Sequence, residues 1–256
     1  MNILETIIEN KKLYVAAQKE AGLLASLGKN EYPTLSLKEA LQQSATGIIA
    51  EFKRKSPSKG WIFPDADAKI ITTGYAKSGA TALSILTDEH FFGGTLDDLR
   101  QARPLVNIPI LRKDFIIDPY QIQVANAAGA NVILLIAAAL EKEECENLAK
   151  QAHDLGLEVL LEIHEESELD YITQNVDIVG VNNRNLKTFV TDVEISFTLG
   201  EKIPAEFVKI SESGISNPKT VKALRAAGFG GFLMGEAFMK EDEPDKALAH
   251  FIKALR

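Results

Sequence analysis

A charged stretch at residues 51–58, with the sequence Glu-Phe-Lys-Arg-Lys-Ser-Pro-Ser, carries side chains suited to acid–base chemistry. It follows the apolar run 47–50, which is typical of a buried strand. Charged side chains at the end of such a strand cost desolvation free energy unless they are paired, solvated or used in function. Two interpretations fit this stretch: a solvated junction between strand and loop, or the rim of an active site. The other strand ends decide between them.

Other apolar runs also end in polar residues. Lys113, Glu162, Asn182 and Glu212 each close a short run rich in Ile, Val and Leu. One charged strand end is usually structural, because the chain meets water there. Several of them in one cleft would shift each other's pKa values, which is how acid and base roles are separated. The candidate catalytic residues are therefore Glu51, Lys53, Lys113, Glu162, Asn182 and Glu212.

The elements that must position these residues follow a regular alternation. We expect strands at 48–53, 82–86, 108–113, 132–136, 158–162, 178–182, 208–212 and 231–235. Helical patterns occupy 65–78, 96–103, 119–128, 141–155, 166–174, 193–199, 218–227 and 244–255. This order predicts one α/β domain over residues 1–256, a (β/α)8 TIM barrel whose strand ends meet at one mouth. A doubly wound open sheet is the alternative.

A helical extension is expected before the first strand, over residues 1–45. Ile3, Leu4, Ile7 and Ile8 form an apolar stripe, and a second short helix is expected at 36–43. No strand pattern occurs in this region. We expect these helices to cover the barrel mouth and help to bind the substrate.

The last two strand ends indicate a phosphate site. Ser213 and Gly214 follow the seventh strand, and Gly235 and Glu236 follow the eighth. Glycine lets the backbone approach an anion, and this fold often binds phosphate there. The simpler interpretation is that these glycines only serve tight turns. Because the Glu236 side chain is acidic, we expect only its backbone to contribute.

Composition excludes several classes of function. The chain has 256 residues, 46% of them hydrophobic, and a formal net charge of −8, which disfavours a nucleic-acid partner. The apolar run 132–140 is too short to span a bilayer, and the first residues do not resemble a targeting peptide. We therefore expect a cytoplasmic protein that does not bind membranes.

Histidine and cysteine do not suggest a metal centre. The four histidines, which lack metal-ligand spacing, are interpreted as surface or satisfied residues. Cys145 is the only cysteine, and its acidic neighbours should raise the pKa of its thiol. We expect no metal ligand and no intrachain disulfide.

Taken together, the motifs resemble those of the indole-3-glycerol phosphate synthases of tryptophan biosynthesis. The resemblance runs from the helical extension to the last helix, and its motifs lie at 51–60, 86–88, 92–94, 113–115, 162, 182–186, 211–215 and 233–236. It implies a monofunctional lyase that converts 1-(2-carboxyphenylamino)-1-deoxyribulose 5-phosphate to indole-3-glycerol phosphate, carbon dioxide and water. It also implies no cofactor and a monomer. Another sugar-phosphate barrel enzyme and a non-catalytic phosphate-binding barrel are the alternatives.

The resemblance also implies roles for individual residues. Lys113 would be the general acid of ring closure and Glu162 the general base. Glu51 and Lys53 would support the dehydration, while Asn182 and Glu212 would orient hydroxyls and lysines. The substrate-binding residues would be Ser56, Pro57, Phe92, Phe115, Leu134, Arg184, Leu186 and Leu233, and the phosphate-binding residues Ser213, Gly214, Gly235 and Glu236. Because a lysine acid needs a lowered pKa near neutral pH, we expect Lys53 and Lys113 to lower it for one another.

Overall fold

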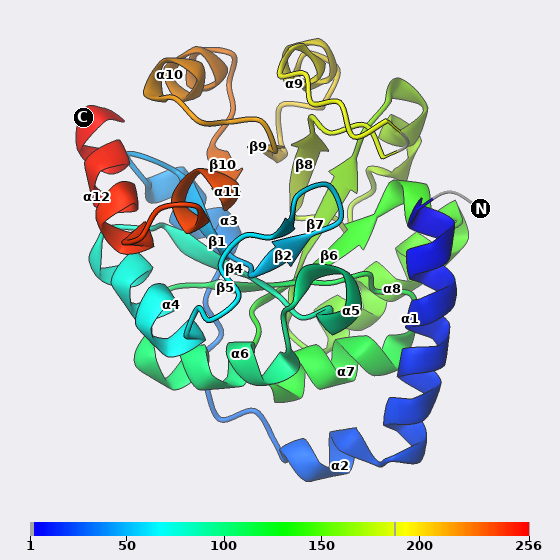
Figure 1. The fold of residues 1–256 in the computed structure, drawn as a ribbon. Helices are drawn as coiled ribbons and strands as arrows, with labels where there is room; N and C mark the ends of the chain where they lie inside the picture. Colours follow the sequence, from blue (N-terminus) through cyan, green and yellow to red (C-terminus); the bar gives the residue numbers. More distant parts are fainter. Residues whose placement is uncertain (1–2, 187, 256) are drawn as a thin grey trace.

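The computed structural model describes residues 3–186 and 188–255. Eight parallel strands close into a barrel in the order β1-β10-β9-β8-β7-β6-β5-β4, with the helices arranged around them (Figure 1). The barrel strands are β1 (Ile48–Phe52), β4 (Ala82–Leu86), β5 (Ile110–Lys113), β6 (Val132–Ile136), β7 (Glu158–Ile163), β8 (Ile178–Asn182), β9 (Val208–Glu212) and β10 (Gly231–Met234). The closed order confirms the predicted (β/α)8 barrel and excludes the open sheet.

Helices connect successive barrel strands. They are α4 (Ala68–Lys77), α6 (Leu96–Ala102), α7 (Pro119–Ala127), α8 (Lys142–Asp154), α9 (Glu194–Gly200), α10 (Pro218–Ala226) and the closing α12 (Pro244–Leu255). Two of them begin with an Asx cap before proline: Asp118 accepts from the backbone of Tyr120, and Asn217 from that of Lys219. Short helices not expected from the sequence are α5 (Glu89–Phe92), α11 (Glu236–Met239), η1 (Arg103–Leu105) and η2 (Ala137–Ala139).

The predicted helix at 166–174 is wrong in type. This segment is the 3₁₀ helix η3 (Glu166–Tyr171). The Glu168 carboxylate accepts from the backbone N–H groups of His164 at 2.5 Å and Glu165 at 3.4 Å. These bonds belong to a capping box between Glu165 and Glu168, which fixes where the helix begins.

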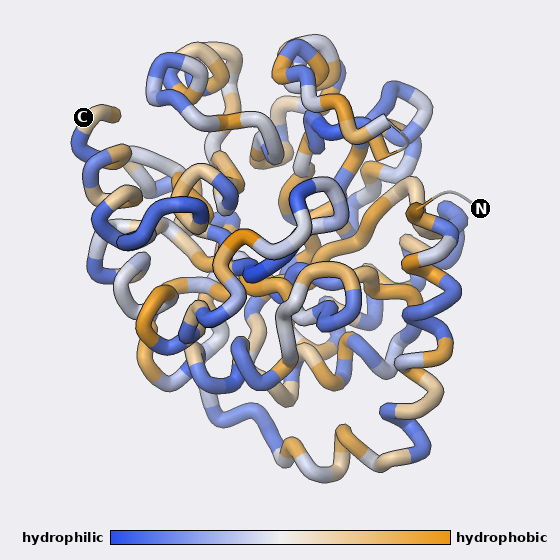
Figure 2. The backbone as a smooth tube through the Cα atoms, viewed as in Figure 1, coloured by the Kyte–Doolittle hydropathy of each residue, from blue (hydrophilic) through white to orange (hydrophobic). Residues whose placement is uncertain are grey.

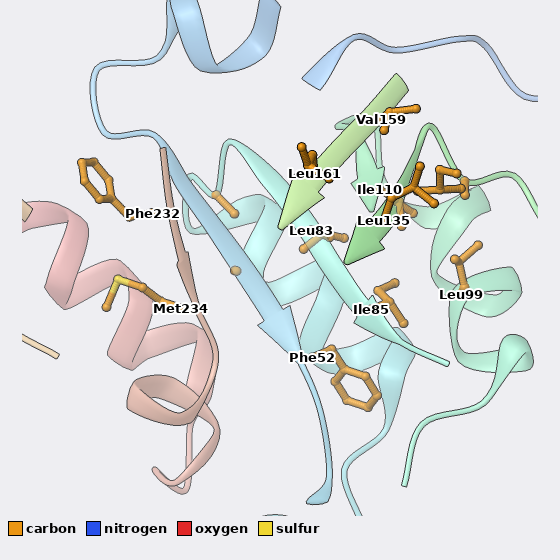
Figure 3. Close-up of a cluster of buried hydrophobic side chains, with 14 of the residues drawn as sticks. Phe52, Leu83, Ile85, Leu99, Ile110, Leu135, Val159, Leu161, Phe232 and Met234 are labelled. Carbon is orange, nitrogen blue, oxygen red and sulfur yellow. The ribbon is translucent and has the colours of Figure 1, made fainter. Parts of the chain in front are cut away.

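The core has two layers because alternate strand residues point to opposite faces. Outward-facing side chains pack against the surrounding helices, as Leu83 and Ile85 of β4 do near Leu99 of α6 (Figure 3). The inward-facing set fills the barrel itself and consists mainly of Ile49, Ala82, Leu111, Val132, Leu134, Ile136, Leu160, Ile178, Ile210 and Leu233. Toward the carboxyl ends of the strands, the same inward face carries the polar side chains of the candidate catalytic residues.

The loop after β1 forms a hairpin, which the sequence analysis did not predict. Strands β2 (Lys55–Ser56) and β3 (Gly60–Trp61) pair antiparallel. Arg54 makes two bonds of 2.7 Å to the Asp98 carboxylate at the start of α6 and one of 2.9 Å to the Gly93 carbonyl in the loop before it. The hairpin is therefore fixed beside the barrel mouth.

The N-terminal extension is helical, as predicted. It comprises α1 (Ile3–Glu20), α2 (Leu23–Leu27) and α3 (Leu37–Gln43), and α1 alternates hydrophilic and hydrophobic residues along its length (Figure 2). Leu37 and Leu41 of α3 join the inward-facing core. Glu158, at the start of β7, accepts from Leu37 N at 2.7 Å, which places α3 at the end of the barrel opposite the mouth. Among the described residues, no helix is long and apolar enough to cross a membrane.

A buried cation attaches α1 to the barrel mouth. The Lys11 side chain is 2% exposed, and its Nζ lies 2.6 Å from Asp88 Oδ2 and 2.7 Å from Asp114 Oδ1. Burial alone would lower the pKa of Lys11, but the two carboxylates outweigh it and raise the pKa. Arg112 contacts the second oxygen of Asp114 at 2.9 Å, so both acids are held in place.

Lys11→Met should destabilise the protein by about 3–5 kcal/mol, because it leaves two buried carboxylates without their shared cation. The free energy of unfolding in urea measures this loss. Lys12→Met is the matched control, since Lys12 forms only an exposed pair with Glu9 and should change stability by less than about 0.5 kcal/mol. Equal losses in the two variants would show that the buried pair does not hold α1.

Candidate active site

One cleft at the carboxyl ends of the strands contains all six candidate catalytic residues. They are Glu51, Lys53, Lys113, Glu162, Asn182 and Glu212. Each continues the inward face of its strand, in step with residues such as Ile49, Leu111, Leu160 and Ile210. The structure thus brings together side chains that the sequence only places at separate strand ends.

A buried ion pair lies at the centre of the cleft. Lys113 Nζ is 2.7 Å from Glu162 Oε2 and 3.3 Å from Glu212 Oε2. Asn182 Nδ2 donates to the other Glu162 oxygen at 3.1 Å. The Glu162 side chain is only 3% exposed, so its charge depends on these protein groups rather than on water.

The ion pair sets the protonation of its members. Burial alone lowers the pKa of Lys113, but Glu162, Glu212 and Glu51 outweigh it and hold the pKa well above its ordinary value. Burial raises the pKa of Glu162, and Lys113 overcomes this effect and lowers the pKa below its usual range. The expectation that Lys53 lowers the pKa of Lys113 is wrong, because Lys53 pairs with Glu51 at 2.6 Å instead.

Glu212 is the carboxylate of the cleft whose pKa lies near neutral pH. Burial, helped by repulsion from Glu162 and Glu51 and opposed by Lys113, raises the pKa of Glu212 to about 7. Its Oε1 is buried and, among the described residues, has no hydrogen-bond partner. Gly180 makes room for this oxygen, since a Cβ there would lie 2.3 Å from it. This oxygen is therefore buried against the backbone of β8, without a proton donor among the described residues.

Apolar side chains line another part of the cleft. Phe92 and Phe115 lie with ring centroids 6.1 Å apart. The predicted residues Pro57, Leu134, Leu186 and Leu233 also line it, together with Ile3, Leu4 and Ile7 of α1. The expectation that the extension helices cover the mouth therefore holds for α1, but it is wrong for α3, which lies at the opposite end of the barrel.

Ser56 is the one predicted site residue outside the cleft lining. It is 2% exposed within the hairpin, where its hydroxyl accepts from the backbone of Lys59 at 3.3 Å. Its position is explained by the pairing of β2 with β3, which the sequence did not reveal.

The predicted phosphate residues lie together at one side of the cleft. Ser213, Gly214, Gly235 and Glu236 all line it, as does Arg184. Ser213 and Gly214 are successive residues of positive φ, at 67° and 73°, so the chain turns sharply here. The Glu236 carboxylate is oriented toward two cations, 3.8 Å from Arg184 and 3.9 Å from Lys59.

The sequence interpretation missed His164. Its side chain is 10% exposed and its Nε2 lies 3.3 Å from Glu162 Oε1, so it is neither a surface residue nor a remote one. Its position two residues after Glu162 on the same strand face is the signal that could have found it. For Cys145, the raised thiol pKa of about 11 agrees with expectation, but its cause is burial rather than acidic neighbours.

No group of three or more His, Cys, Asp or Glu side chains in the described parts of the chain could hold a metal ion.

A parallel eight-stranded barrel with acids and bases at its mouth defines a (β/α)8-barrel enzyme. A family model described as Indole-3-glycerol phosphate synthase matches residues 4–251. The chain therefore belongs to the indole-3-glycerol phosphate synthase family, carboxy-lyases of tryptophan biosynthesis.

Known relatives agree with this assignment. A Bacteroides thetaiotaomicron protein named indole-3-glycerol phosphate synthase is 57% identical over 258 residues, covering 100% of this chain and 99% of that protein. A Burkholderia vietnamiensis protein of the same name is 43% identical over 260 residues, with 97% and 98% covered.

Solved structures support the fold alone. Tryptophan synthase subunit alpha from Legionella pneumophila has a TM-score of 0.62 at 16% identity, covering 86% of this chain and 96% of that one. The 3-hexulose-6-phosphate synthase of Salmonella typhimurium has a TM-score of 0.61 at 13% identity, with 82% and 100% covered.

Glu212→Gln should stabilise the protein more at pH 8 than at pH 5. The folded pKa of about 7 lies above the ordinary 4.5, so the folded state binds this proton more tightly and loses stability as pH rises between these values. The glutamine does not titrate. The free energy of unfolding of the variant minus that of the wild type should therefore be roughly 2–3 kcal/mol larger at pH 8 than at pH 5.

Urea unfolding at both pH values measures this shift. Asp97→Asn, which alters an exposed pair with Arg100, is the control and should change by less than about 0.5 kcal/mol. A Glu212→Gln difference that is the same at pH 5 and pH 8 would contradict the raised pKa.

Proposed function

We propose that this cleft closes the indole ring of 1-(2-carboxyphenylamino)-1-deoxyribulose 5-phosphate, with Lys113 as general acid and Glu162 as general base. The observation that carries the proposal is their ion pair of 2.7 Å at the cleft centre. It keeps the lysine protonated and the carboxylate ionised at neutral pH, the states in which each can act. The products would be indole-3-glycerol phosphate, carbon dioxide and water.

Ring closure would use the proton of Lys113. The ring carbon bearing the carboxylate attacks the ribulose carbonyl, whose oxygen takes this proton and becomes a hydroxyl. Carbon dioxide then leaves, and its bonding electrons restore the aromatic ring. When the substrate carbonyl accepts from Lys113, it replaces part of the contact with Glu162, so the high pKa of the lysine falls toward the range of a useful acid.

Dehydration would use the ion pair of Lys53 and Glu51. Lys53, held 2.6 Å from Glu51, would supply the proton with which the hydroxyl leaves as water. Glu162 would take the proton released as the new double bond forms. Two protons are donated and one is accepted, which matches the one proton that decarboxylation and dehydration together consume.

Binding would divide between the two sides of the cleft. The aromatic ring would lie among Phe92, Phe115 and the neighbouring leucines, and the phosphate at Ser213, Gly214, Gly235 and the backbone of Glu236. Arg184 would add positive charge near the substrate, while Asn182 and Glu212 would orient hydroxyls. Ser56 would act only by shaping the hairpin.

We also propose that the protein acts on this phosphorylated substrate as a monomeric single-domain barrel in the cytoplasm. A net charge of −8 supports the exclusion of nucleic acid. Its only cysteine, Cys145, is a buried free thiol, which fits a reducing compartment.

Turnover should proceed with a chelator present, and Lys113→Met and Glu162→Gln should each lower kcat by roughly 10²–10⁴-fold. Indole fluorescence follows the reaction of the carboxyphenylamino-deoxyribulose phosphate. Lys150→Met, in an exposed pair with Glu146, is the control and should keep wild-type kcat. Tight substrate binding without turnover in the wild type would instead establish a non-catalytic binding barrel.

Gly214→Ala should raise KM about tenfold or more, because its Cβ would lie 2.5 Å from Thr191 Cγ2 and would force the proposed phosphate loop to move. Gly228→Ala is the matched control: its φ of 88° is equally unfavourable for alanine, but it precedes β10 away from the mouth. Both variants should lose some stability, and only the first should weaken inhibition by inorganic phosphate. Equal KM values in Gly214→Ala and Gly228→Ala would contradict the proposed position of the substrate phosphate.

A further inference from the structure

His164 is a buried ionisable group for which the proposed chemistry gives no role. It follows β7 directly and continues the inward face that carries Glu162. It does not line the cleft. Both ring nitrogens are buried, and no described residue gives either of them a hydrogen bond of standard geometry.

Two carboxylates face the imidazole from opposite sides. Nε2 lies 3.3 Å from Glu162 Oε1, and Nδ1 lies 3.5 Å from Glu168 Oε2 of η3. A neutral imidazole carries one N–H, so it could donate to only one of these acids. The imidazolium carries two and suits both. Burial opposes this charge, but the two carboxylates overcome it and raise the pKa of His164 to about 9.

Glu162 therefore lies between two cations, of which only Lys113 lines the cleft where substrate would bind. Lys113 of β5, which lines the cleft, contacts Oε2, and His164, which does not line it, faces Oε1. Asn182 of β8 donates to the same Oε1 as a neutral group. Of these groups only the lysine is proposed to lose a proton during ring closure, which would leave Glu162 with His164 as its nearest cation.

We propose that His164 is a positioning residue for this reaction, which as an imidazolium keeps Glu162 ionised and oriented while Lys113 gives its proton to the substrate. The inference rests on the proposed function of Lys113 and Glu162. Without the second cation, a buried carboxylate beside a neutral amine would gain proton affinity before its own step. Glu168 stabilises the imidazolium from the outer side and does not touch the cleft.

His164→Gln tests the proposal through the pH dependence of kcat. We expect kcat to fall about tenfold with KM within about twofold, since substrate contacts are unchanged. The acidic limb of the kcat profile should move to higher pH, because Glu162 loses one of the two cations that lower its pKa. A folded variant with wild-type kcat and an unmoved acidic limb would overturn the proposal.

Glu168→Gln provides a second variant that leaves His164 and Glu162 in place. An amide oxygen can still accept the backbone bonds of η3, while the imidazole loses one of its two carboxylates. We expect near-wild-type kcat at pH 7 and an alkaline limb shifted to lower pH. If His164→Gln does not fold, an unmoved alkaline limb here overturns the proposal.

NMR titration of ¹⁵N-labelled histidine separates this inference from the proposed function. The His164 ring should be doubly protonated at pH 7 in the wild type, and a neutral ring would overturn the inference whatever the activity. Conversely, wild-type turnover that survives Glu162→Gln would overturn the proposed base itself. Loss of turnover in Glu162→Gln together with full activity in His164→Gln would overturn only the role of His164.

Discussion

The ion pair between Lys113 and Glu162 is the constraint on which the rest of the cleft depends. A barrel interior of Ile, Leu and Val solvates charge poorly, so each charged side chain at its end requires a partner. Asn182, Glu212 and His164 all lie around this pair. The room that Gly180 leaves for Glu212 serves the same arrangement. The pKa values of Lys113, Glu162 and Glu212 therefore each depend on the charges around them, and removing one of these charges changes the protonation of its neighbours.

The strand ends could be predicted because strand geometry is local. A period of two carries the inward face from Leu160 to Glu162 and from Ile210 to Glu212, and a closed barrel makes such ends converge. The family, the barrel and the six residues that meet in the cleft therefore followed from pattern and motif. The same reasoning extends to His164, two residues after Glu162 and directly after β7, and applying it there would have corrected the interpretation of that residue.

Contacts between distant loops could not be predicted in this way. The hairpin position depends on Arg54 meeting Asp98, 44 residues later, and it removes Ser56 from the cleft. The pKa of Lys113 depends on which charged side chain lies nearest to it. No pattern in the sequence indicates that Glu162 lies nearer to Lys113 than Lys53 does. Likewise, burial of Lys11 requires Asp88 and Asp114 from two later loops. In each case the three-dimensional packing of the loops, rather than local preference, decides the outcome.

The N-terminal extension contacts the barrel at both ends, with α1 at the mouth and α3 at the opposite end. Ribosomes synthesise this segment before the barrel, and its partners come late in the chain. Ser36 bonds Glu158, which is 122 residues further along the chain, and Leu41 packs with Ile210 of β9. The extension therefore cannot complete its packing until most of the barrel has been made. During synthesis its apolar stripes lack their partners, so the nascent chain passes through a stage that is exposed to aggregation.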